Sequence, residues 1–128
     1  MAQDILFYDT AGWSMYPFIK SGDKIIVKSV PLERLHVGDI ILFNSEGKTV
    51  CHRIIRIKRE RGGLVVMSRG DSQFGKGESV TKDMVLGKVI GLYKGKRVVN
   101  LETPYCRVVG LLMIYGGPFI ERSPTSFS

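Results

Sequence analysis

The chain has 128 residues, of which 44% are hydrophobic and 24% charged, and this balance excludes a disordered or collagen-like protein. For this length we expect one domain with one core, spanning residues 1–128. The formal net charge of +7 can attract nucleic acid, anionic membrane or acidic peptides. Apart from residues 58–61, however, the basic residues are spread along the chain, so no nucleic-acid partner is expected.

Most of the chain is predicted to form β-strands joined by turns. Fifteen glycines and five prolines favour turns, and the apolar runs between them are short and rich in β-branched residues. The expected strands are residues 5–8, 24–30, 39–44, 49–58, 64–68, 84–93 and 97–101. Residues 45–48 are predicted to form a hairpin turn and residues 70–82 an irregular polar loop. Gly87 and Gly91 would permit bending or bulges in their strand.

The C-terminal part divides into an apolar segment, residues 104–120, and a tail, residues 121–128, that is expected to be loose. Within the apolar segment, residues 108–120 make a stretch of about 13 residues, shorter than the roughly 18 to 20 needed to span a bilayer as a helix. We expect it to pack on the core, residues 5–101. Contact with a membrane surface or a protein partner through 108–120 is the alternative.

The N-terminus and the cysteines indicate in which cellular compartment the protein is expected. The start of the chain has no basic n-region, and residues 5–8 are too short for the h-region of a signal peptide. Cys51 and Cys106 are too far apart for a metal motif or a disulfide scaffold, although a single bridge remains an alternative. We therefore expect a cytoplasmic protein, or one peripheral to a membrane, that needs no metal or cofactor.

The strand 49–58 carries a histidine. Read at period two, one face presents Val50, His52, Ile54 and Arg56, and the other presents Cys51, Arg53, Ile55 and Ile57. Cys51 and His52 thus point to opposite sides of the sheet, which argues against a Cys–His nucleophile pair. Asp71 follows the returning strand 64–68, and His52 lies near the start of its own strand. A hairpin of these two strands is predicted to bring His52 and Asp71 close together.

Ser14 completes a set of chemistry-bearing residues. Pro17 fixes its own φ and biases Tyr16 toward extended backbone, so Ser14 is expected on a short rigid connection. Serine, histidine and aspartate in this chain order can build a nucleophile, a base and an orienting carboxylate. The backbone N–H of Ser14 is the natural donor to an oxyanion. Each residue also has an ordinary interpretation, as a turn serine, a half-buried strand histidine and a turn acid.

Short motifs that occur in order over residues 12–91 carry a family resemblance. They are Ser14-Met15-Tyr16-Pro17, Ser21-Gly22-Asp23, Val37-Gly38-Asp39-Ile40, His52-Arg53-Ile54, Arg69-Gly70-Asp71 and Gly87-Lys88-Val89. Each motif is weak alone, but the ordered set resembles the signal peptidase I family of serine peptidases, whose fold the self-cleaving repressors share. The resemblance implies a mainly β fold in which coiled antiparallel sheets form a partly open barrel.

The resemblance also implies a serine endopeptidase with Ser14 as nucleophile, His52 as base and Asp71 as orienting acid. The base is lysine in the best-known bacterial members and histidine in the archaeal and endoplasmic-reticulum type, so the chain is similar to the histidine subtype. Because an imidazole has an ordinary pKa near 6.5, activity is expected to rise across pH ~6 to 7. The subtype usually carries a further aspartate about six residues after the first. Gly77 stands near that position here, and the adjacent Glu78 is only a weak substitute.

Family members bind an extended peptide by strand addition and cut it after small residues such as alanine. The N-terminal membrane anchor of ordinary signal peptidases is missing from the pattern, so we expect a leader peptide, a precursor or the chain itself as substrate. The alternative function is a non-catalytic basic β-barrel module that binds protein or nucleic acid. Against it, the aromatic residues are scattered rather than interleaved with basic ones.

Overall fold

The computed structural model describes residues 5–9, 15, 19–73, 75–103, 111, 112 and 114. Its elements in chain order are β1 (Ile5–Asp9), β2 (Lys24–Lys28), the 3₁₀ turn η1 (Leu32–Arg34), β3 (Ile40–Ser45), β4 (Lys48–Glu60), β5 (Gly63–Arg69), β6 (Glu78–Thr81), the 3₁₀ turn η2 (Lys82–Met84), β7 (Val85–Lys94) and β8 (Arg97–Asn100). The predicted mainly β fold class is confirmed.

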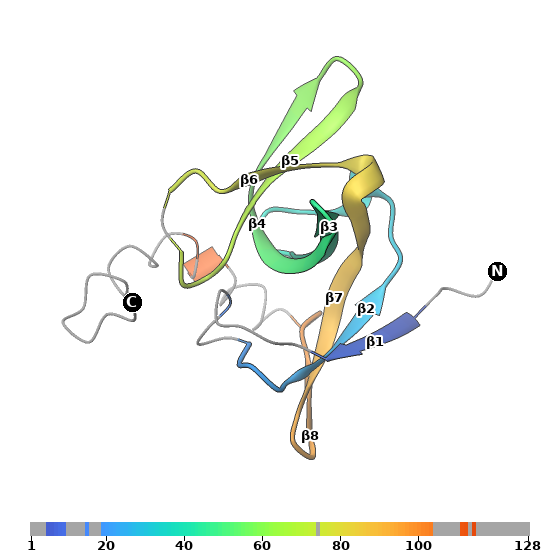
Figure 1. Cartoon of the computed structure of the whole chain (residues 1–128), viewed down its shortest axis with the longest axis vertical. Coiled ribbons are helices and arrows are strands. Elements are labelled where there is room, and N and C mark those ends of the chain that lie inside the picture. Colours follow the sequence, from blue (N-terminus) through green and yellow to red (C-terminus); the bar gives the residue numbers. More distant parts are fainter. Residues whose placement is uncertain are drawn as a thin grey trace.

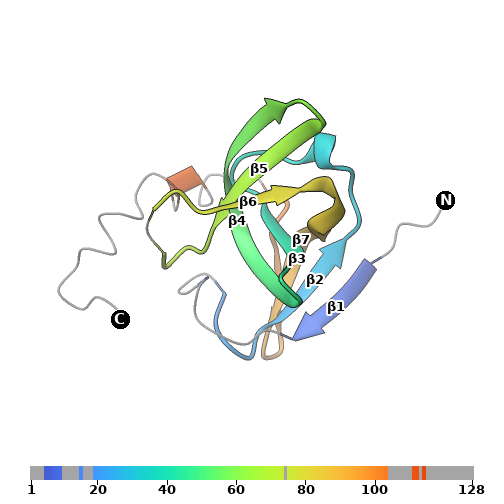
Figure 2. The same cartoon turned by 45° about the horizontal axis from the view of Figure 1, so that its top comes forward.

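The strands form one antiparallel sheet in the order β1-β2-β7-β3-β4-β5-β6, with β8 also paired to β7. The sheet coils strongly and β4 curves around β3, yet the sheet does not close into a barrel (Figures 1 and 2). The far ends of β4 and β5 extend beyond the rest of the sheet as a two-stranded ribbon. Among the described strands, β1 and β6 end the main order of the sheet, and β8 is a further edge beside β7.

Strand β7 joins the two parts of the sheet because it pairs with β2 on one side and β3 on the other. The β2 register shifts between Ile26 and Val27, and the β3 register shifts next to its pairing with Gly87. A Cβ atom at Gly87 would lie 2.6 Å from Val27 Cγ1 and 2.7 Å from the Lys28 carbonyl oxygen. The bulges that were expected at the glycines of this strand are therefore present, and they allow close approach of β2.

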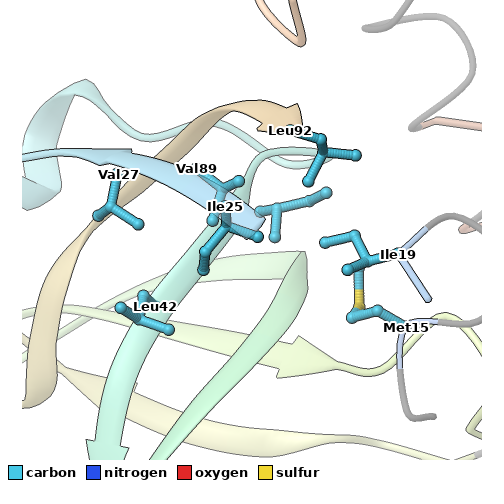
Figure 3. Close-up of a cluster of buried hydrophobic side chains, with 8 residues drawn as sticks. Met15, Ile19, Ile25, Val27, Leu42, Val89 and Leu92 are labelled. Atoms are coloured by element: carbon cyan, nitrogen blue, oxygen red, sulfur yellow. The ribbon is translucent and has the colours of Figure 1, made fainter. Parts of the chain in front are cut away.

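The core consists of two buried clusters that share strand β3. Alternation along β3 sends Ile40 and Leu42 into the first cluster and Ile41 and Phe43 into the second. The buried members of the first cluster, most of which are labelled in Figure 3, are Met15, Ile19, Ile25, Val27, Ile40, Leu42, Val89 and Leu92. Those of the second are Leu32, Leu35, Ile41, Phe43, Ile54, Val66 and Val80.

The prediction of an irregular loop over residues 70–82 is wrong at its C-terminal end. Residues 78–81 form β6, in which Val80 is fully buried and pairs with Val66 of β5. One apolar residue among polar neighbours gives too little periodicity to reveal a strand from sequence. The register of this strand places Glu78 opposite Ser68.

In the apolar C-terminal segment, Leu111, Leu112 and Ile114 are helical, and the remainder of 104–120 and all of 121–128 lie outside the described residues. A Cβ atom at Gly38 would lie 3.6 Å from Leu111 Cδ2, and Arg69 Nη2 donates to the Ile114 carbonyl oxygen at 3.4 Å. Leu111 and Ile114 thus lie against Gly38 and Arg69, although Leu111 and Leu112 remain exposed. None of the helices within the described ranges has the length and apolar character needed to cross a bilayer.

Candidate active site

His52 lies on β4, paired with Ile41 of β3, and only 8% of it is exposed. Its ring packs edge-on against Phe43, with ring centroids 5.8 Å apart. On its other side the imidazole borders an open pocket of about 520 Å³. The residues that line this pocket are His52, Ser68, Gln73, Lys76, Gly77 and Glu78. The histidine is thus held rigidly by the sheet at the boundary between core and solvent.

Burial lowers the pKa of His52 below its ordinary value of 6.5, and the carboxylates of Glu78 and Asp71 act in the opposite direction. Its Nδ1 atom is buried and has no hydrogen-bond partner among the described residues, and the same holds for Ser68 Oγ on the same pocket. The imidazole is therefore neutral at pH 7 and able to take up a proton.

Asp71 does not orient His52 as predicted, because its carboxylate is bound by Arg53. Arg53 Nε donates to Oδ1 at 2.8 Å and Nη2 donates to Oδ2 at 2.7 Å, and both side chains are 3% exposed. The remaining guanidinium nitrogen, Nη1, donates to the Gly38 carbonyl oxygen at 2.9 Å. The expected hydrogen bond between His52 and Asp71 is thus replaced by a buried bidentate ion pair.

The physical reason lies in the alternation of β4. The hairpin register pairs Arg53 with Arg69, so the loop after β5 does begin beside the start of β4 as predicted. Successive side chains point to opposite faces, and Asp71 lies on the face of Arg53, where its backbone N–H contacts Met15 Sδ at 3.4 Å. The sequence argument placed the right segments together but chose the wrong one of two adjacent side chains.

Glu78 is the acidic residue that the structure places on the pocket with His52. Its Oε2 atom accepts a hydrogen bond of 2.5 Å from Ser45 Oγ at the end of β3. From the sequence, Glu78 is only a weak substitute for the aspartate that the histidine subtype usually carries near position 77. A Cβ atom at Gly77 would lie 2.1 Å from the Ser68 carbonyl oxygen, and its φ is +80°, so that position accepts no side chain.

Cys51 lies on the other face of β4 from His52, as predicted. It packs against the first core cluster, whereas the His52 ring contacts Phe43 of the second. Burial raises the pKa of the Cys51 thiol from 9.0 to about 12, so it is a protonated structural residue rather than a nucleophile.

The remaining candidate acids support turns. Asp23 Oδ2 accepts from the backbone N–H of Lys20 at 2.9 Å and from Lys94 Nζ at 2.6 Å. Asp39 Oδ2 accepts from the backbone N–H of His36 at 2.8 Å. Within the described part of the chain, no group of three or more His, Cys, Asp or Glu side chains could hold a metal ion.

Ser14, the predicted nucleophile and oxyanion donor, lies outside the described residues. The next residue, Met15, is 4% exposed and packs in the first core cluster (Figure 3). Its contact with the backbone of Asp71 joins this part of the chain to the loop that follows β5.

The model of the Peptidase S24-like family matches residues 2–90. The chain belongs to the Peptidase S24-like family. This is a family of the serine peptidase and self-cleaving repressor type, and it includes members without catalytic activity. A comparison with curated proteins finds no match. The S24-like range includes Ser14, His52 and the residues that line the pocket, and it extends into β7.

Proposed function

We propose that this S24-like chain is a serine endopeptidase of the histidine-base subtype, with Ser14 as nucleophile and His52 as base, that cuts a leader or precursor peptide after small residues. The observation that carries the proposal is the state of His52. Burial lowers the pKa of its imidazole below 6.5, which favours the neutral form at pH 7, and the residue borders a pocket open to solvent. These are the properties of a general base.

In the proposed reaction, the Ser14 hydroxyl oxygen attacks the carbonyl carbon of the scissile peptide bond while His52 accepts the hydroxyl proton. The backbone N–H of Ser14 donates to the oxyanion. The C–N bond then breaks, and the protonated imidazole gives its proton to the leaving amine. Water attacks the acyl-serine with His52 again as base, which releases the new carboxylate and restores the hydroxyl.

Substrate binding by strand addition is supported by the position of β6. This strand lies at the edge of the sheet, and its first residue, Glu78, lines the pocket. An extended peptide paired to the outer side of β6 would reach the pocket at Glu78, the end of β6 that shares the pocket with His52.

The proposal is tested by incubating the full chain with a diverse peptide pool from pH 5 to 9 and identifying cleaved bonds by mass spectrometry. Cleavage after small residues should fall by roughly 10³-fold or more in Ser14→Ala and His52→Ala. The matched control His36→Ala should retain wild-type cleavage, because His36 lies outside the pocket and its side chain is 61% exposed. The rate should rise with pH below 6.5 and be level above it.

Equal cleavage by the wild type and Ser14→Ala would overturn the proposal. Absence of cleavage by the wild type, together with nucleic-acid binding that collapses as salt increases, would favour the alternative of a basic binding module.

A further inference from the structure

We propose that Glu78, held in place by Ser45, is the residue that positions the His52 imidazole, in the role that the sequence assigns to Asp71. As a statement about mechanism this inference rests on the proposed function, but the Glu78–His52 interaction itself can be measured without any activity.

The first step is that Asp71 is already bound on the other face of β4. Both of its oxygens accept hydrogen bonds from Arg53, and the pair is almost completely buried. The Arg53 guanidinium holds this carboxylate on the face of β4 opposite His52, so Asp71 belongs to the surroundings of Arg53 rather than to those of the imidazole. Asp71 therefore acts on His52 only as a more distant negative charge.

The second step is that Glu78, unlike Asp71, lines the same pocket as His52. It comes from β6, shares the pocket with His52, and lies opposite Ser68 in the strand register. The hydrogen bond from Ser45 fixes Oε2, and a carboxylate has a second oxygen that can accept the imidazole N–H at the same time.

The third step concerns two buried polar atoms. His52 Nδ1 and Ser68 Oγ have no hydrogen-bond partner among the described residues, and both residues line the pocket that contains Glu78. Leaving such atoms unsatisfied is costly, so hydrogen bonds from them to the second oxygen of Glu78 are favoured. The Glu78 carboxylate would then accept from both.

The charged groups around His52 agree with this assignment. Glu78 of β6 and Lys76 of the preceding loop share the pocket with it, whereas Asp71 acts from the other face of β4, where it is paired with Arg53. Of the two carboxylates, Glu78 raises the pKa of His52 more than Asp71 does. Replacing Glu78 by a neutral residue should therefore make His52 a weaker base.

The test is an NMR titration of the histidine side chains in the full chain, which contains only two histidines. In Glu78→Gln the pKa of His52 should be lower than in the wild type, and in Glu78→Asp it should lie between the two. The matched control Glu60→Gln removes the same charge from the end of β4, away from the pocket, and should leave His52 unchanged. The signal of His36 serves as an internal reference in each variant.

A double-mutant cycle tests the role of Ser45. Ser45→Ala should alter the pKa of His52 when Glu78 is present, and should have no effect on it in the Glu78→Gln background. An unchanged His52 pKa in folded Glu78→Gln would overturn the inference. If that variant does not fold, an unchanged His52 pKa in both Glu78→Asp and Ser45→Ala would do the same.

In the peptidase assay, Glu78→Gln should lower kcat/KM by roughly tenfold or more and move the acidic limb of the pH profile to lower pH. A merely structural defect would lower the plateau without moving the limb. Should the wild type cleave nothing, the proposed function fails while the titration still decides the Glu78–His52 interaction.

Discussion

His52 and Arg53 are consecutive residues of β4 that differ in charge and in surroundings. His52 faces the pocket and is neutral, whereas Arg53 is charged and almost completely buried with Asp71. Strand alternation separates them, so a cationic structural residue lies next to a neutral imidazole without sharing its surroundings. The buried ion pair fixes the loop after β5, and that loop forms one wall of the pocket through Gln73, Lys76 and Gly77.

At the residue scale, Gly77 determines where the acid of the site can be placed. A Cβ atom there would lie 2.1 Å from the Ser68 carbonyl oxygen, and φ is +80°. We expect Gly77→Asp, which inserts the residue usual in the histidine subtype, to destabilise the fold by about 3 kcal/mol or more and to abolish activity rather than improve it. Urea unfolding measures the first effect and peptide cleavage the second.

Gly77→Ala and Gly75→Ala form a matched pair that separates backbone strain from the contact at position 77. Gly75 also has a positive φ, +96°, but no atom lies within 4 Å of its Cβ position. Gly75→Ala should therefore lose stability only through backbone strain, by about 1 to 2 kcal/mol. Similar losses in Gly77→Ala and Gly75→Ala would show that contact with Ser68 does not restrict position 77.

At the element scale, β7 connects the halves of the sheet. It pairs with β2, β3 and β8, and each of its first two partners shifts register along it. These shifts increase the local twist of the strands and let the sheet coil around the core. The pocket depends on this arrangement, because β3 supplies both Phe43, which packs against His52, and Ser45, which binds Glu78.

We expect Gly87→Ala to destabilise the protein by about 1 to 3 kcal/mol, because its methyl group would overlap Val27 Cγ1 and the Lys28 carbonyl oxygen. Gly62→Ala is the matched control: its Cβ position has open space and its φ is not positive, so the change should stay within about 0.5 kcal/mol. Thermal and urea unfolding of both variants measure the difference. Equal stability of the two would contradict the close approach of β2 and β7.

At the scale of the whole molecule, the open sheet leaves the pocket and the β6 edge on one side of the fold. The two clusters bury the apolar side chains of β3 on both of its faces, so β3 serves as the centre of the molecule. His52 lies one strand away from this centre, and the folded state therefore desolvates its imidazole. Folding and protonation of this residue are consequently linked.

We expect the free energy of unfolding to fall as the pH decreases below 6.5, with His52 contributing at most about 1.4 kcal/mol per pH unit. The pKa of His52 is 6.5 in the unfolded chain and lower in the folded one, so between these values the unfolded chain binds the additional proton. The contribution is fully present above pH 6.5. Urea unfolding of the wild type and His52→Asn from pH 5 to 8 measures it.

His52→Asn should show a shallower dependence of stability on pH than the wild type. If the dependence of the free energy of unfolding on pH disappeared in His36→Asn but not in His52→Asn, it could not be assigned to the buried His52.

Local features of this chain were determined by its sequence. Glu46 and Gly47 form the hairpin turn between β3 and β4 with φ of +51° and +79°, as the glycine at that turn indicated. The separation of Cys51 and His52 follows from a side-chain period of two, which needs no knowledge of other strands. The ordered motifs also pointed to a peptidase fold that the S24-like match supports.

The composition of the pocket, by contrast, was decided only by the tertiary structure. Ser45 and Glu78 are 33 positions apart and meet only because β3 to β6 coil together. Asp71 could have bound either of two adjacent side chains, and the guanidinium, with two parallel donors on the face where Asp71 lies, binds it more strongly than an imidazole could. Such competition depends on distances and burial, which exist only in the folded chain.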